Sequence, residues 1–220
     1  MVRPRKLDIE QALDVATALF WSNGYDGTSL SDLTKAMGIT PPSFYFAFGS
    51  KEALFRRVYE RYRSGHLAYV AEALEAPTAR EVGERMLYGG ADAQTGGGHP
   101  PGCMGVSCAS PGPVGCDPVR DDLIENRRLG WKALCERFEL AVASGDLPQG
   151  TDVEALARFV HVVGLGMSID AQGGASRDDL RRMVDVAMKA WPRGTSDEPS
   201  RGGVPRQSKT CPITRIRRRD

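Results

Sequence analysis

Polar, aromatic and proline residues share one side of a short predicted helix at residues 40–47, within residues 28–55, TSLSDLTKAMGITPPSFYFAFGSKEALF. The apolar residues Leu33, Phe44 and Phe48 fall at spacings that would bury them on the other side. A helix face of this composition can enter the major groove of DNA and contact base edges and phosphates. The chemistry that this stretch supports is therefore recognition of double-stranded DNA.

The first element that must position this face is a helix at about residues 8–23. Asp8 can accept hydrogen bonds from the first free amides, and Gln11 follows at capping-box spacing. Gly24 favours a stop, because glycine adopts the left-handed conformation without steric cost.

Two short helices follow, and their ends are marked by cap residues. Thr28 can cap the first of them and Gly38 supplies the turn between the two. Thr40 can cap the second, with Pro41 and Pro42 in the first turn, where a missing N–H has no cost. This order predicts a helix-turn-helix.

A longer helix is expected from Lys51 to about Leu74, and the rest of the chain also has helical periodicity. Further helices are predicted at about residues 77–91, 119–144, 152–170 and 176–191. The sequence thus predicts an all-α fold. Trp131, near the middle of the 119–144 helix, could line a ligand pocket or fill the core.

Residues 8–62 resemble the N-terminal domain of the TetR family of bacterial one-component transcriptional regulators. The resemblance is carried by ALFWSNGYDGTSLSDL, AMGIT and PPSFYFAFGSKEALF, and most specifically by Tyr45, Phe48, Ser50, Lys51 and Glu52. It implies an N-terminal three-helix helix-turn-helix DNA-binding domain at residues 1–50. It also implies a C-terminal helical ligand-binding and dimerisation domain at residues 51–192. Residues 193–220 have no apolar period, so we expect a disordered basic tail there.

The resemblance also implies roles for individual residues. Thr28 would place its hydroxyl against a phosphate, Tyr45 would hold another, and Lys51 would clamp the neighbouring backbone. The groove-facing residues would be Thr40, Pro41, Ser43, Tyr45 and Phe46. Many relatives carry arginine or another polar residue at the position of Pro41, which cannot donate a hydrogen bond to a base but can contact a thymine methyl group.

Cysteines gather in the Gly- and Pro-rich segment 95–118, at Cys103, Cys108 and Cys116. They could be small apolar residues packed in the effector domain, as free cysteines commonly are, or Cys103 could be a reactive thiol. A disulfide between Cys103 and Cys108 is possible in a loop. Zinc binding is disfavoured because the C-x4-C and C-x7-C spacings lack a tight pair, so no metal or other cofactor is expected.

Composition places the chain among ordinary globular proteins, with 220 residues, 41% hydrophobic and 26% charged. The net charge is +1; residues 193–220 carry eight basic and three acidic side chains, a charge of +5, which leaves −4 for the rest. No apolar run is long enough to span a membrane, no signal peptide is visible, and the odd cysteine count favours the cytoplasm. The basic residues of the arm 1–7 could contact phosphate.

Catalytic and nucleotide-binding motifs such as G-x-S-x-G, H-E-x-x-H and the P-loop do not occur, so an enzyme is not expected. We expect a homodimeric repressor that joins its copy through helices near 152–170 and 176–191, as the family does. It would bind a palindromic operator and leave it when an unidentified small molecule binds. The alternatives are a repressor that senses electrophiles or oxidants through Cys103, and a structural helical module that does not bind DNA.

Overall fold

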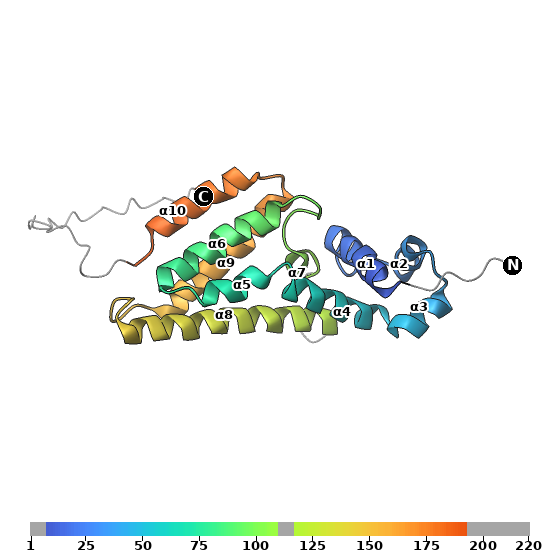
Figure 1. Ribbon diagram of the computed structural model, residues 1–220, viewed down its shortest axis with the longest axis horizontal. Coiled ribbons are helices and arrows are strands. Elements are labelled where there is room, and N and C mark those ends of the chain that lie inside the picture. The colour runs from blue at the N-terminus through green and yellow to red at the C-terminus, as the bar shows by residue number, and fades with distance from the viewer. Residues whose placement is uncertain (1–7, 110–116, 193–220) are drawn as a thin grey trace, which may run out of the picture.

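The computed structural model describes residues 8–109 and 117–192, which form ten α-helices and no strand (Figure 1). The helices are α1 (Ile9–Asn23), α2 (Leu30–Met37), α3 (Pro41–Phe48), α4 (Lys51–Ser64), α5 (Ala68–Leu74), α6 (Ala79–Thr95), α7 (Met104–Ser107), α8 (Pro118–Ser144), α9 (Val153–Gln172) and α10 (Arg177–Lys189). The predicted all-α fold is confirmed. The N-terminal arm 1–7, Cys116 and the basic tail 193–220 lie outside the described residues.

The N-terminal end of the molecule is a small bundle in which α1 packs on α2 and α4, and α3 packs on α2 and α4. Its core is aromatic: the rings of Phe20 and Phe55 meet edge to face at 5.2 Å, and Phe44 and Phe48 lie 5.4 Å apart. Each buried phenylalanine contributes about 1.5–3 kcal/mol of transfer free energy. This core fixes the orientation of α3.

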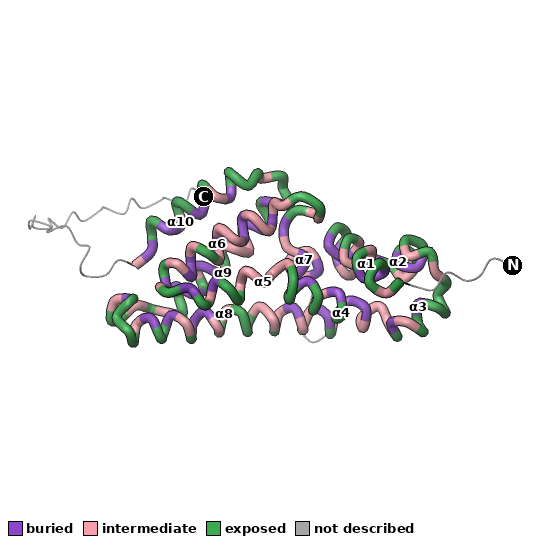
Figure 2. Tube along the Cα trace, viewed as in Figure 1, coloured by how far each residue is buried: buried purple, intermediate pink, exposed green. Residues whose placement is uncertain are grey.

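The C-terminal half is a helical bundle in which α6 packs against α5, α9 and α10 while α8 runs alongside α9 (Figure 1). Figure 2 shows the buried residues as stripes on the inner sides of these helices. The rings of Phe138 and Trp191 meet edge to face at 5.7 Å and join α8 to the end of α10. The amphipathic periodicity in the sequence therefore has a direct counterpart in this core.

The division between the N-terminal and C-terminal cores does not lie at residue 50, the domain boundary that the sequence suggested. Residues of α4, including Leu54 and Val58, are fully buried in the N-terminal core, as are Met104 of α7 and Leu123 of α8. A boundary at residue 50 therefore falls inside one continuous packing unit. The helices α4 and α7 connect the helix-turn-helix to the C-terminal bundle.

The helix expected from Lys51 to Leu74 is two helices, which corrects that prediction. A turn at residues 65–67 separates α4 from α5, and the Gly65 amide caps α4 by donating to the Arg61 carbonyl. The turn lets His66 leave the helix axis and contact Trp21 at 4.8 Å between ring centroids. The helix expected at 77–91 begins at Ala79 and continues to Thr95.

Candidate DNA interface

The helix α3 is amphipathic across its short length, as the sequence predicted. Phe44 and Phe48 are buried in the N-terminal core, while Phe46 is 96% exposed and Tyr45 is 53% exposed. Pro41 and Ser43 are exposed on the same outward side. Phe46 forms an exposed apolar patch with Tyr45 and Pro41, and a patch of this kind suits a surface that contacts another molecule.

The N-terminus of α3 carries two hydroxyl groups that bond to each other. Thr40 Oγ1 accepts a hydrogen bond from the Ser43 amide at 3.4 Å and lies 3.0 Å from Ser43 Oγ. One of the two O–H groups donates to the other, so one O–H remains available to donate to a phosphate or a base edge. Thr40 is therefore both the cap of α3 and part of its exposed polar face.

Thr28 does not have the position that the resemblance implied, because its side chain is buried. Its hydroxyl donates to the Gly24 carbonyl at 2.8 Å and lies 3.2 Å from the Leu19 carbonyl. The cap of α2 is Ser29, which forms a reciprocal capping box with Asp32. Thr28 thus holds the end of α1 against the start of α2, and its hydroxyl is not directed to a phosphate.

Ser29 is the residue that sequence reasoning missed at this end of α2. The signal was present, since Ser29 and Asp32 have the spacing of a capping box directly before Leu33. The Ser29 hydroxyl accepts from the Asp32 amide at 3.1 Å, and Asp32 accepts from the Ser29 amide at 2.9 Å. Ser29 is exposed, so the start of α2 lies at the surface.

Lys51 begins α4 beside the exposed face of α3, and Ser50 caps this helix by accepting from the Ala53 amide. The ammonium of Lys51 lies 4.1 Å from the ring centroid of Tyr25, a cation–π contact that orients it. Burial lowers the pKa of Lys51, and Asp26 partly opposes this effect. An oriented, partly desolvated ammonium interacts more strongly with a phosphate than one free in solvent.

The candidates that the sequence offers for an effector or sensor site, which we call the three effector candidates, are Cys103, Cys108 and Trp131, and they are divided between the two cores. Cys103 is half-buried at the start of α7 and accepts a hydrogen bond from the Tyr62 hydroxyl at 3.2 Å. Cys108 is buried, donates to the Phe20 carbonyl, and has a pKa raised to about 12 by burial and by nearby Cys103. Trp131 packs against the C-terminal core, where the Arg158 guanidinium lies 4.2 Å from its ring centroid.

Cysteine pairing and metal binding can be examined over the part of the chain that the structure describes. Cys103, Cys108 and Cys135 are free thiols there, and no cluster of three or more His, Cys, Asp or Glu side chains could hold a metal ion. An open hollow of about 460 Å³ lies at the far end of the bundle, between the α8–α9 turn and the end of α10. Its lining includes Leu156 and Phe159 but none of the three effector candidates.

The helix-turn-helix region and most of the chain are similar to known transcriptional regulators. Residues 12–58 match the model of bacterial regulatory proteins of the tetR family. The chain is 33% identical over 193 residues to the HTH-type transcriptional repressor ComR of Escherichia coli K12, which covers 86% of this chain and 91% of ComR. The chain belongs to the TetR family.

Solved structures agree with membership of the TetR family. A cysteine-substituted CifR, a TetR family transcriptional regulator in complex with 26-bp double-strand operator DNA, is 40% identical at a TM-score of 0.80. The match covers 86% of this chain and all of that one. A putative TetR regulator from Rhodococcus sp. RHA1 is 42% identical at a TM-score of 0.59, over 84% of this chain and all of that one.

Membership of the TetR family means that the chain is a DNA-binding transcriptional regulator with a helix-turn-helix, and not an enzyme. None of the helices within residues 8–109 and 117–192 has the length and apolar content needed to cross a membrane.

Proposed function

We propose that this TetR-family protein is a homodimeric repressor that binds a palindromic operator and is released from it by a small molecule. The observation that carries the proposal is the outward face of α3, where Phe46 is 96% exposed beside Ser43 on a helix anchored from below by Phe44. Double-stranded DNA is the partner that such a face fits. The operator complex of CifR supports this assignment.

The reading residues are Thr40, Ser43 and Phe46, with the apolar ring of Pro41. Tyr45 and Lys51 anchor phosphates, together with the exposed amides at the Ser29 end of α2. This set contains few hydrogen-bond donors, so methyl contacts and the shape of the DNA contribute much of the discrimination.

The homodimer places two copies of α3 in successive major grooves, roughly 34 Å apart. Val162 and Ile169, 55% and 62% exposed, lie on α9 and offer an apolar surface to a second copy. We assign the interface to α9 and α10 for this reason. Because its DNA partner is there, the protein acts in the cytoplasm.

Electrophoretic mobility shift with the DNA that flanks its own gene tests this function. We expect a salt-dependent complex with one site in that DNA and much weaker binding to random DNA of the same length. A structural helical module would bind neither DNA. Equal binding to both DNAs would contradict sequence-specific recognition by this protein.

A second candidate function is a repressor that is released when Cys103 is modified by an electrophile or oxidant. The observation that favours it is the position of Cys103, half-buried directly before α7, where its sulfur accepts a hydrogen bond from the Tyr62 hydroxyl of α4 and an added group would displace that contact. If the Cys103→Ser variant dissociates from operator DNA as readily as the parent when an electrophile is added, the thiol plays no part in release. A separate ligand site must then account for it.

A further inference from the structure

Two of the three histidines in the chain meet at the joint between the DNA-binding bundle and the C-terminal half. His66 lies in the turn after α4, and His99 lies in the loop between α6 and α7; their rings meet edge to face at 4.6 Å. Trp21 of α1 stacks on His99 at 4.6 Å and meets His66 at 4.8 Å. We call Trp21, His66 and His99 the ring junction.

The ring junction is packed for neutral imidazoles. A backbone hydrogen bond to Ala93 of α6 is available to the His66 ring, but its Nε2 is buried without a partner, as is Nε1 of Trp21. A proton on Nε2 would leave a buried N–H unsatisfied until the junction opened to water. The Nδ1 of His99 lies 2.8 Å from the Pro100 carbonyl, which occupies that nitrogen.

We propose that the ring junction is an acid-sensitive joint, in which protonation of His66 separates α1 and α4 from the α6–α7 loop and weakens operator binding. This proposal rests on the repressor function above for its consequence on DNA. The joint itself is a property of the free protein and can be measured without DNA.

Electrostatics at the ring junction gives the direction of the effect. Burial lowers the pKa of His66, and His99 lowers it further, while the Ala93 hydrogen bond opposes both. Tyr62 of α4 offers no compensating anion, because it stacks on His66 at 5.1 Å with its own pKa raised by burial and donates to Cys103.

The pH window follows from that direction. An open junction would release His66 to its ordinary pKa of about 6.5, above its value in the closed junction. The closed junction is therefore fully stable above about pH 6.5 and loses stability as the pH falls below that value, because the open form then binds more protons.

A movement at the ring junction can change the position of the DNA-binding helix α3 through two helices, α1 and α4. Trp21 belongs to the last turn of α1, and His66 lies two residues after the end of α4, whose first residue, Lys51, comes three residues after the end of α3. A displacement of α1 and α4 from the loop would therefore change the orientation of α3, and with it the fit of two readers to one operator.

Operator affinity as a function of pH, at constant ionic strength, tests the proposal. Between about pH 7.5 and about pH 5.5 we expect the parent to lose about tenfold in affinity, a usual size for coupling between two sites. The double variant His66→Phe with His99→Phe keeps the rings without the charge and should lose less than about twofold. The matched control is His161→Phe on α9, a histidine whose pKa is also lowered by burial, and it should behave as the parent does.

Proton NMR on the parent gives the second readout, and the three histidines of the chain make assignment direct. We expect His66 to titrate below the ordinary midpoint of about 6.5, with the ring resonances of Trp21 moving at the same pH. Trp21 resonances that stay fixed while His66 titrates would overturn the joint, whether or not an operator is found. A double variant as pH-sensitive as the parent would overturn its link to DNA binding.

Discussion

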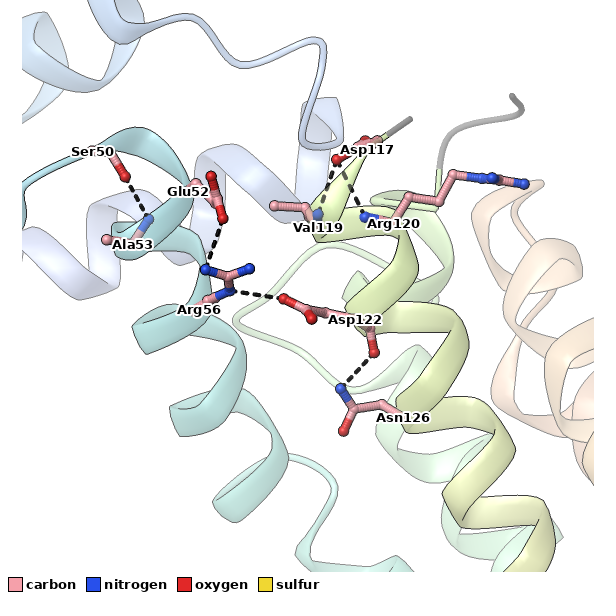
Figure 3. A network of polar contacts seen from close by, with 9 residues as sticks. All are labelled: Ser50, Glu52, Ala53, Arg56, Asp117, Val119, Arg120, Asp122 and Asn126. Carbon is pink, nitrogen blue, oxygen red and sulfur yellow. Dashed lines mark hydrogen bonds and ion pairs between the residues drawn. The ribbon is translucent and has the colours of Figure 1, made fainter. Parts of the chain in front are cut away.

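Arg56 of α4 donates from Nε to Oδ2 of Asp122 on α8 at 2.8 Å, and its Nη1 lies 2.7 Å from Oε1 of Glu52 (Figure 3). The contact with Asp122 joins α4, the helix that follows the helix-turn-helix, to α8, the longest helix of the C-terminal half. Hydrogen bonding to Asp122 raises the pKa of Arg56, so the guanidinium is charged at every physiological pH. The contact lies beside the shared apolar core that holds α4 against α8.

Removing the Arg56–Asp122 contact is expected to change stability little, because both side chains are about half exposed and screened by solvent. In a double-mutant cycle with Arg56→Gln and Asp122→Asn, we expect a coupling free energy of about 0.2–1 kcal/mol that decreases as salt is added. Chemical denaturation measures it. A salt-independent coupling above about 2 kcal/mol would contradict a solvent-screened pair.

Phe46 should contribute to DNA binding and not to stability, because it is 96% exposed. We expect Phe46→Ala to change the free energy of unfolding by less than about 0.5 kcal/mol. It should reduce discrimination between operator and random DNA by about 1–3 kcal/mol. The matched control is Phe44→Ala on the same helix, where a fully buried ring is lost at a cost of about 3–5 kcal/mol. Unchanged discrimination in Phe46→Ala would remove Phe46 from the reading set.

Thr28 is expected to behave in the opposite way, because its hydroxyl bonds to backbone carbonyls inside the protein. Thr28→Val keeps the shape but removes the donor, so we expect a loss of about 1–3 kcal/mol in unfolding free energy. Operator affinity measured well below the Tm should stay within about twofold of the parent. An intact Tm with reduced affinity would instead restore the phosphate contact that the resemblance implied.

Features that depend on neighbours in sequence could be predicted. The helix-turn-helix, the burial of Phe44 and Phe48, and the cap at Asp8 follow from spacing and capping chemistry within one or two turns. The long helices of the C-terminal half were expected within two residues of α8, α9 and α10, because each carries an amphipathic stripe with a cap or a glycine near its ends.

Features that depend on distant residues could not be predicted. The break after Ser64 lies inside an amphipathic pattern, and the turn contacts Trp21, more than forty positions earlier in the chain. The role of Thr28 was misread because threonine suits both a cap and an internal donor, and only the folded backbone decides between them. The Arg56–Asp122 pair likewise has no local signature.

The thiols of Cys103 and Cys108 should differ in reactivity, although five residues separate them. The pKa of Cys108 is raised to about 12, so at about pH 8 only about one thiol in ten thousand is ionised, and the thiolate is the reactive form. We expect iodoacetamide to modify Cys103 well before Cys108, as followed by peptide mass spectrometry. Cys103→Ser should leave Cys108 unmodified in the folded protein, and urea should expose it. Early modification of Cys108 would mean that α7 opens readily.

Ile169 lies on the exposed face of α9 with Val162, seven residues or about two turns away, and Gly166 between them leaves open space. A charge at the centre of an apolar interface is left unpaired when two copies meet. Ile169→Asp should therefore reduce the mass in solution from twice 23.9 kDa to the mass of one chain, as measured by light scattering. Operator affinity should fall by about 10²–10⁴-fold, because the two readers would then bind independently.

The matched control for Ile169→Asp is Leu140→Asp on α8, since Leu140 is 66% exposed and Ile169 62%. Both variants place a carboxylate on a helix surface, so a general effect of charge on folding or on DNA repulsion would appear in both. We expect Leu140→Asp to keep the dimer mass and to bind operator within a few-fold of the parent, because isolated surface substitutions rarely disturb distant sites. If both variants stay dimeric, the interface lies on another surface; if both become monomeric, α8 belongs to it as well.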